Sequence, residues 1–301
     1  MLPSRLGLAL LAALVLSAPV AASAQNGRSL GLSAHSVLLI DAEGRVLYAK
    51  SPEDDHAPAS LVKLMTLYLA YEDLEAGWVS LDDLVVVSRN AATTPRYRMG
   101  LRPGERVPVR VLMEGVAIAS ANDAATALAE HLSGTEAAFV DRMNAKALAF
   151  GLASTRYANP HGLPDPVQRT SARDLAQLTV RLLEDYPDAR TMLGGQMFVW
   201  RGRVYARHIP LFRDPGGVQA LKTGFTREAG YNLSVSAWKN GHRFVMIVLG
   251  AQSRGLSYAD AKKLLQYGFV ETGLDVPPPD PRPRVTPKRP VKLRTRRGSA
   301  R

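Results

Sequence analysis

One short pattern in the sequence carries the residue types of a serine nucleophile and its base. Ser60-Leu61-Val62-Lys63 follows Ala57-Pro58-Ala59. If Ser60 lies in the first turn of a helix, Lys63 lies one turn further along the same face, where its amine can reach the hydroxyl. A hydroxyl is a weak nucleophile until a neighbouring base takes its proton. A lysine can be that base when burial or nearby positive charge lowers its pKa. Taken alone, the pattern is more typical of a helix cap followed by a solvent-facing lysine.

Two further triplets offer groups that could hold and process a peptide. Ser120-Ala121-Asn122 lies between two helix-like segments, where the serine could relay a proton and the asparagine amide could hold a peptide. Lys222-Thr223-Gly224 lies in a β-like segment, and a strand edge can bind an extended peptide through its backbone. There the lysine and threonine would hold a carboxylate, and the glycine would let the substrate backbone approach closely. Alone, each triplet is also typical of a turn or a strand end.

The hydrophobic periodicity of the chain predicts the elements that must position these residues. Helices are expected over residues 60–76, 108–119, 123–132, 136–148, 171–184 and 258–270. Strands are expected over residues 36–40, 45–49, 84–87, 218–226, 231–238 and 243–249. Asn240-Gly241 between the last two strands is the strongest short signal for a hairpin. Prolines across residues 78–110 favour loops there.

The order of these elements predicts the fold class. Strands open the domain, helices fill its middle, and strands and a helix close it. We therefore expect an α+β fold, in which an antiparallel β-sheet built from both ends of the domain is flanked by helices, with an inserted helical lobe.

Residues 1–24 have the composition of a cleavable secretory signal. Arg5 is the only charged residue before Arg28, and residues 6–20 form an apolar run. Ala22-Ser23-Ala24 then has the small residues of a signal-peptide cleavage site. The run is shorter than the roughly 20 residues that span a bilayer, although a membrane-anchoring helix is the alternative. We expect export, cleavage near Ala24, and a location in the periplasm or cell envelope.

The positive charge of the chain is concentrated in its last residues. Residues 276–301 hold nine Lys or Arg and one acid, Asp280, so residues 1–275 carry only +3 of the net charge of +11. This Pro-rich basic tail is expected to be extended and disordered, while residues 25–275 form the catalytic domain. The tail could contact an anionic envelope surface, or it could be solvated without a partner. Export argues against a nucleic-acid partner.

The absence of cysteine limits the chemistry that the chain can perform. With no Cys in 301 residues, thiol catalysis, thiolate metal sites and disulfide bonds are excluded. No pattern of metal ligands stands out, so we expect neither a metal nor a cofactor.

The three patterns occur together, in the order S-x-x-K, S-x-N and K-T-G, which is typical of penicillin-binding proteins and class A β-lactamases. The longer blocks around them are residues 58–66, 120–125, 159–163, 221–226 and 229–233. On these blocks the chain resembles the low-molecular-mass penicillin-binding proteins, specifically the D-alanyl-D-alanine carboxypeptidases of the S11 serine peptidase family. The resemblance covers about residues 33–273.

The resemblance implies a catalytic role for several of these residues. Ser60 would attack the carbonyl between two D-alanines, Lys63 would take its proton, and Ser120 would help to pass that proton to the leaving amine. Backbone N–H groups of Ser60 and Phe225 would form the oxyanion hole. Water would then hydrolyse the acyl-enzyme, whereas β-lactams would acylate Ser60 and stay.

The resemblance also implies how substrate binds. Lys222 and Thr223 would hold the terminal carboxylate of a peptidoglycan stem peptide, beside Gly224, and Lys222 is expected to depress the pKa of Lys63. Asn122 would orient the substrate peptide. Arg254 is a further candidate for the carboxylate, with a surface loop arginine as the alternative.

The sequence also allows alternative interpretations of His161 and of the function. His161 is expected to be a structural turn residue, because no second His or Asp pattern marks it as a base or a metal ligand. A D,D-endopeptidase that cleaves crosslinks would use the same motifs as a carboxypeptidase. A class A β-lactamase would need an E-x-x-L-N pattern, which is absent between residues 122 and 222. A non-catalytic wall-binding protein would need a broken motif, and none is broken.

Overall fold

A computed structural model of the chain describes residues 30–213 and 216–275. The expected signal segment, residues 1–24, and the expected tail, residues 276–301, lie outside the described residues. The helices span Lys63–Glu75 (α1), Arg89–Thr93 (α2), Val109–Ala117 (α3), Asn122–Ser133 (α4), Glu136–Ala149 (α5), Ala172–Asp185 (α6), Asp188–Gly194 (α7) and Arg254–Glu271 (α8), with 3₁₀ turns at Ala59–Val62 (η1) and Pro210–Arg213 (η2).

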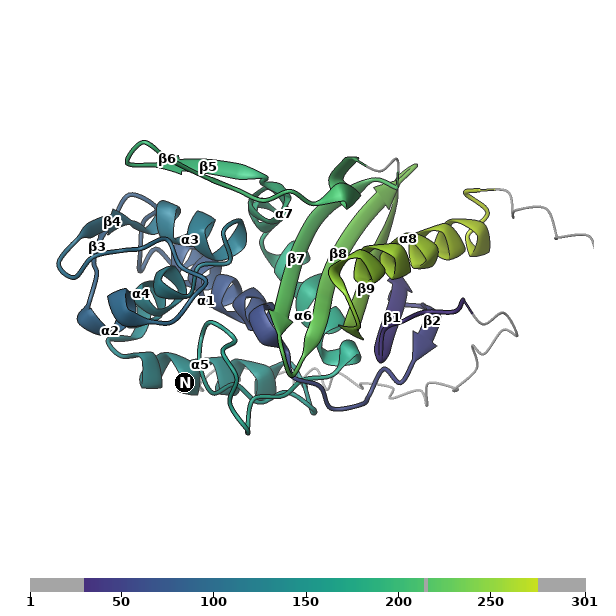
Figure 1. The fold of residues 1–301 in the computed structure, drawn as a ribbon, viewed down its shortest axis with the longest axis horizontal. Helices are drawn as coiled ribbons and strands as arrows, with labels where there is room; N and C mark the ends of the chain where they lie inside the picture. Colours follow the sequence, from purple (N-terminus) through teal and green to yellow (C-terminus); the bar gives the residue numbers. More distant parts are fainter. Residues whose placement is uncertain (1–29, 214–215, 276–301) are drawn as a thin grey trace, which may run out of the picture.

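A five-stranded antiparallel sheet forms the larger half of the molecule. Its order is β2 (Val46–Lys50), β1 (Ser36–Asp41), β9 (His242–Ala251), β8 (Gly230–Lys239) and β7 (Val218–Thr226). The first two strands of the chain therefore pair with the last three, and helices α1 to α5 lie beside the sheet as a separate lobe (Figure 1). The predicted α+β architecture with an inserted helical lobe is confirmed.

Helices cover the sheet on both faces, because successive residues of its central strands point to opposite sides. Leu38 belongs to the hydrophobic cluster that contains Leu178 of α6. The next residue, Leu39, belongs to the cluster that contains Leu264 of α8. Both leucines of β1 are fully buried, so the strand is packed from both sides.

The segments that the sequence left as loops contain short elements. The predicted strand near residue 84 is present as β3 (Leu84–Val86), but its partner β4 (Arg106–Pro108) lies where prolines favoured a loop. That expectation was wrong because a proline is tolerated at the end of a short strand, where its missing N–H interrupts no hydrogen bond between the strands. A second unexpected hairpin, β5 (Met197–Trp200) and β6 (Arg203–Ala206), lies along the helical lobe (Figure 1). Among the described residues, no helix is long and apolar enough to cross a membrane.

The predicted helix over residues 60–76 is divided into two parts. Residues 59–62 form the 3₁₀ turn η1, and the α-helix begins only at Lys63. A 3₁₀ turn has three residues per turn, so side chains at positions i and i+3 line up along it. Ser60 and Lys63 therefore share one face, as predicted, through a tighter turn than the one expected.

A loop over residues 159–163 packs directly on this turn. Gly162 has a φ of +89°, and a Cβ built there would lie 2.0 Å from the carbonyl oxygen of Ala59. Only glycine combines this backbone conformation with so close an approach. The loop can therefore lie against the backbone that carries Ser60.

We expect Gly162→Ala to destabilise the protein by about 1–3 kcal/mol more than Gly77→Ala, which is the usual cost of overpacking. Both glycines have positive φ, +89° and +70°, so both variants carry the same kind of backbone strain. A Cβ at Gly77, however, meets nothing within 4 Å. Equilibrium unfolding in urea measures the difference, and equal losses in the two variants would contradict the close approach.

Candidate active site

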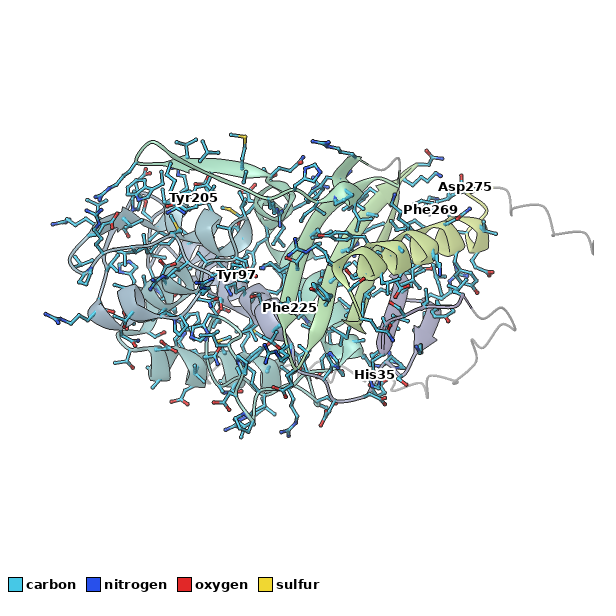
Figure 2. All side chains as sticks on the ribbon, viewed as in Figure 1. His35, Tyr97, Tyr205, Phe225, Phe269 and Asp275 are labelled. Atoms are coloured by element: carbon cyan, nitrogen blue, oxygen red, sulfur yellow. The ribbon has the colours of Figure 1, made fainter. Side chains whose placement is uncertain are left out.

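A cleft of about 320 Å³ lies between the sheet edge and the helical lobe. The predicted site residues that line it are Ser60, Ser120, Thr223, Gly224, Phe225 and Arg254. Tyr97 from the helical lobe also lines the cleft. Tyr97 and Phe225 are both labelled in the middle of the molecule in Figure 2. Lys63, Asn122 and Lys222 lie behind this wall as buried groups.

The amine of Lys63 contacts three oxygen atoms from separate parts of the chain. Its Nζ lies 3.1 Å from Ser60 Oγ and 2.7 Å from Asn122 Oδ1, and it also donates to the carbonyl oxygen of His161. An amide or backbone oxygen can only accept a hydrogen bond, whereas a serine hydroxyl can also donate. A neutral amine therefore places its two N–H groups on Asn122 and His161. Its lone pair is then left for the Ser60 hydroxyl.

Burial favours this neutral form. Lys63 is fully buried, and desolvation lowers its pKa to about 7 despite the opposing charge of Asp123. The carboxylate of Asp123 accepts hydrogen bonds from the backbone N–H groups of Met99, Gly100 and Leu101. These bonds hold its charge on the loop that carries Tyr97 rather than on the lysine.

Lys222 is a second buried lysine next to the cleft. Burial holds its pKa well below the usual value, and the positive charges of Lys63 and Arg207 act in the same direction. Its Nζ donates to Ser120 Oγ at 2.8 Å and to the carbonyl oxygen of Thr223 at 3.0 Å. Lys222 thus links β7 to the serine of the second motif.

The backbone brings Ser120 to the cleft through an unusual conformation. Ser120 has a φ of +55° and lies between α3 and α4. The next amide, of Ala121, donates to the carbonyl oxygen of Gly115 at 2.9 Å. This bond closes the turn between the two helices, so the Ser120 hydroxyl lies in the wall of the cleft.

Asn122 faces Lys63 rather than the open cleft. It is 4% exposed, its Oδ1 accepts from Lys63, and its Nδ2 donates to the carbonyl oxygen of Pro95 at 3.0 Å. Its backbone N–H donates to the carbonyl oxygen of Tyr97 at 2.6 Å. The asparagine therefore ties the lysine to the wall of the cleft that carries Tyr97.

The third motif lies on β7, which is the edge strand of the sheet. A Cβ built on Gly224 would lie 3.1 Å from both the Pro58 carbonyl oxygen and the Ser60 amide nitrogen. Glycine thus allows this strand to lie against the turn that carries the nucleophile. Phe225, the next residue, is 42% exposed and packs on Tyr231 with ring centroids 4.4 Å apart.

The structure places two arginines at the cleft. Arg254, which the sequence singled out, is the first residue of α8 and lines the cleft instead of a remote surface loop. Arg207 was not anticipated, because it follows β6 in a segment that the sequence left unassigned. Its guanidinium donates to the carbonyl oxygens of Leu193, Gly195, Ala117 and Leu221. Burial lowers the pKa of Arg207 to about 10, and no acid among the described residues is ion-paired with it.

His161 contributes its backbone to the site, as expected of a turn residue. Its carbonyl oxygen accepts from Lys63, while its ring lies beside Glu136. Within residues 30–213 and 216–275, no cluster of three His, Cys, Asp or Glu side chains could hold a metal ion.

Comparisons with known proteins show what the chain is similar to. The sequence profile of the family Peptidase_S11, D-alanyl-D-alanine carboxypeptidase, matches residues 21–253. The D-alanyl-D-alanine carboxypeptidase DacF of Bacillus subtilis is 36% identical, over 84% of this chain and 67% of its own length. DacC of Escherichia coli is 37% identical, over 85% of this chain and 66% of its own length. The chain thus spans about two thirds of the length of these relatives.

One further relative is named an endopeptidase, and one similar protein has a solved structure. A D-alanyl-D-alanine endopeptidase of Pseudomonas aeruginosa is 31% identical, over 80% of this chain and 78% of its own length. The crystal structure of penicillin binding protein 5 from Haemophilus influenzae superposes with a TM-score of 0.77 at 35% identity, covering 79% of this chain and 71% of that protein.

We expect the Lys63 side chain to titrate near neutral pH in the resting protein. Burial destabilises the ammonium form, so the amine is neutral above its pKa of about 7. NMR of protein labelled with ¹³C at lysine Cε measures the titration, and the Lys63 signal is assigned by its absence from Lys63→Met. The pKa of a free lysine is about 10.4, and a titration midpoint of Lys63 at that value would contradict the buried neutral base.

Proposed function

The chain belongs to the D-alanyl-D-alanine carboxypeptidase family of serine peptidases, and from this premise we propose that it removes the terminal D-alanine from peptidoglycan stem peptides. The observation that carries the proposal is the amine of Lys63, 3.1 Å from Ser60 Oγ. Its two other neighbours are obligate acceptors, so the lone pair of a neutral amine is directed at the hydroxyl. The hydroxyl is thereby prepared to lose its proton as it attacks.

The proposed reaction proceeds through an acyl-enzyme. Ser60 Oγ bonds to the carbonyl carbon of the penultimate D-alanine while its proton passes to Lys63 Nζ. The C–N bond then breaks, and the proton returns through the Ser120 hydroxyl to the leaving amine of the terminal D-alanine. Water hydrolyses the resulting ester, which restores the Ser60 hydroxyl and releases the shortened peptide. Each proton taken by the lysine is given back within one turnover.

Backbone amides at the junction of η1 and β7 support a role in charge stabilisation. The N–H groups of Ser60 and Phe225 would hold the oxyanion of the tetrahedral intermediate. A donor of this kind contributes about 3–4 kcal/mol in comparable sites. The close packing of Gly224 on the Ser60 backbone supports this pairing, because it brings the strand that carries Phe225 next to the turn that carries Ser60.

Positive charge at the cleft supports recognition of a free carboxylate. Lys222 and Thr223 on β7 would hold the terminal carboxylate, with Arg254 at the start of α8 as a further donor. The N-terminus of a helix adds partial positive charge in the same place. Asn122, which was expected to orient the peptide, faces Lys63 and would act on the reaction by holding that amine through its Oδ1. This arrangement favours an exopeptidase that reads a chain terminus.

A D,D-endopeptidase that cleaves crosslinks is the second candidate. Its support is the endopeptidase of Pseudomonas aeruginosa at 31% identity, below the 36–37% identity of the two carboxypeptidases. A non-catalytic wall-binding protein has no such support, because the nucleophile and its base are within hydrogen-bond distance. The carboxypeptidase is therefore the function that we retain.

The remaining expectations extend the same proposal. β-Lactams imitate the D-alanyl-D-alanine end and would acylate Ser60, in line with the name of the penicillin binding protein that shares this fold. We also propose that residues 1–24 direct export to the periplasm or cell envelope. The catalytic domain would span residues 25–275, and the basic residues 276–301 would contact an anionic envelope surface.

We expect Ser60→Ala to abolish covalent labelling by a fluorescent penicillin and to leave the fold intact. The substitution removes only the hydroxyl that Lys63 contacts at 3.1 Å, so circular dichroism and thermal unfolding should match the unmodified protein. Ser80→Ala, at an exposed serine, is the matched control and should label fully. Labelling that persists in Ser60→Ala would refute the assignment of the nucleophile.

We expect the protein to release D-alanine from a stem pentapeptide faster than it cleaves a crosslinked dimer. The physical reason is the cationic end of the cleft, which suits a free terminal carboxylate. Mass spectrometry of both substrates after incubation with equal amounts of enzyme measures the preference, with Ser60→Ala as the blank. Cleavage of the dimer alone would replace the carboxypeptidase with the endopeptidase.

A further inference from the structure

The carbonyl oxygen that Lys63 binds belongs to a loop with its own internal hydrogen bonds. Asn159 Oδ1 accepts from the Gly162 amide at 2.7 Å, and Asn159 Nδ2 donates to the Leu163 carbonyl at 3.1 Å. The carbonyl oxygen of Pro160 accepts from the hydroxyl of Thr66 in α1 at 2.6 Å. Consecutive carbonyls of this loop thus bind the first turn of α1, one at Thr66 and one at Lys63.

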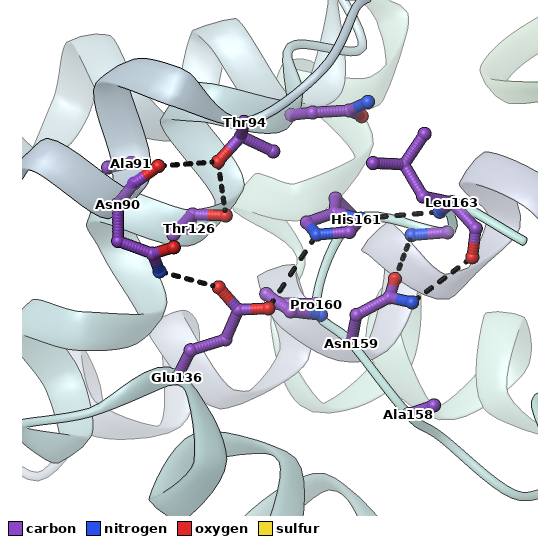
Figure 3. A network of polar contacts seen from close by, with 12 residues as sticks. Asn90, Ala91, Thr94, Thr126, Glu136, Ala158, Asn159, Pro160, His161 and Leu163 are labelled. Atoms are coloured by element: carbon purple, nitrogen blue, oxygen red, sulfur yellow. Dashed lines mark hydrogen bonds and ion pairs between the residues drawn. The ribbon is translucent and has the colours of Figure 1, made fainter. Parts of the chain in front are cut away.

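A carboxylate from α5 lies beside the ring of His161 (Figure 3). Glu136, the first residue of α5, places its Oε1 3.6 Å from His161 Nε2, and its Oε2 accepts from Asn90 Nδ2 at 3.1 Å. His161 Nδ1 accepts from the Leu163 amide at 3.2 Å, so the ring proton of a neutral histidine is on Nε2, facing Glu136. Burial lowers the pKa of His161, and the contact with the ring lowers the pKa of Glu136. The pair is an ionised carboxylate next to a neutral imidazole.

We propose that Glu136 and His161 are positioning residues, which hold the His161 carbonyl against Lys63 so that the lysine lone pair stays directed at Ser60. The inference rests on the proposed function of Ser60 and Lys63. When Glu136 releases the ring, the carbonyl moves, and only Asn122 remains as an obligate acceptor. The amine can then rotate away from the Ser60 hydroxyl.

Other charged groups near Lys63 are held by contacts that do not involve Glu136. Asp123 lies on α4, where backbone amides of residues 99–101 hold it. Lys222 lies on β7 and is bound to Ser120. A change in the titration of Lys63 on substitution of Glu136 therefore reports on the loop over residues 159–163. Water that enters when this loop loosens raises the pKa of a buried lysine towards its ordinary value.

The test measures the rate of acylation by a fluorescent penicillin as a function of pH, together with kcat and KM for a stem pentapeptide. For Glu136→Ala we expect acylation and kcat to fall by on the order of 10- to 100-fold, as misplaced catalytic groups do. The acid limb of the rate profile should move to higher pH, while KM is unchanged because no substrate contact is lost. Thermal unfolding verifies that each variant is folded.

Three companion variants separate the contact from charge and from helix stability. Glu136→Gln keeps an acceptor for His161 Nε2 and should retain most of the rate. Glu136→Asp keeps the charge at the start of α5 but is too short for the contact, so it should behave like Glu136→Ala. Glu130→Ala is the matched control, because Glu130 also accepts from Asn90 Nδ2, at 2.9 Å, and should leave the rate unchanged.

The outcomes decide between this inference and the function on which it rests. Glu136→Ala or Glu136→Asp with the original rate and acid limb would overturn the positioning role. So would Glu136→Gln as impaired as Glu136→Ala. If the unmodified protein itself is not acylated, the proposed function fails, and that result is distinct from any difference among the variants.

Discussion

The site depends on the burial of one amine among three oxygen atoms. Lys63 is fully buried, and its contacts come from η1, from α4 and from the loop over residues 159–163. An unpaired ammonium is expensive to bury, whereas a neutral amine with two acceptors and one donor around it is satisfied. The packing of the helical lobe against the sheet edge therefore selects the protonation state that can act as a base.

A second lysine of the site, Lys222, is also buried, and the charge of Lys63 lowers its pKa further. The pKa of each lysine is lowered first by desolvation. Asp123, whose charge opposes the lowering of the Lys63 pKa, is held by the three backbone amides of residues 99–101. Burial thus favours loss of a proton from each of the two lysines.

The sequence predicted the parts of the site that have local signals, and it missed those created by tertiary contacts. β7 was predicted with its observed bounds, because alternation and β-formers are visible in nine neighbouring residues. The Asn240-Gly241 turn was predicted because both residues adopt positive φ, +50° and +83°, which few residue types tolerate. The roles of Arg207 and Glu136 have no such local sequence signal. Arg207 bonds to four backbone carbonyls, and Glu136 acts on a histidine 25 positions along the chain, so neither contact has a sequence pattern.

Backbone strain explains why the bare motifs are weak predictors and the folded site is specific. Ala59 and Ser120 are not glycines, yet their φ values are +48° and +55°, a conformation that costs about 1–2 kcal/mol per residue. Each is held by its surroundings. Asn232 Nδ2 donates to the carbonyl oxygens of Ala57 and Pro58, and Lys222 donates to Ser120 Oγ. In an ordinary helix cap, the same residue types would not require these positive φ angles. The surrounding sheet and loops impose them, and the two hydroxyls reach one cleft as a result.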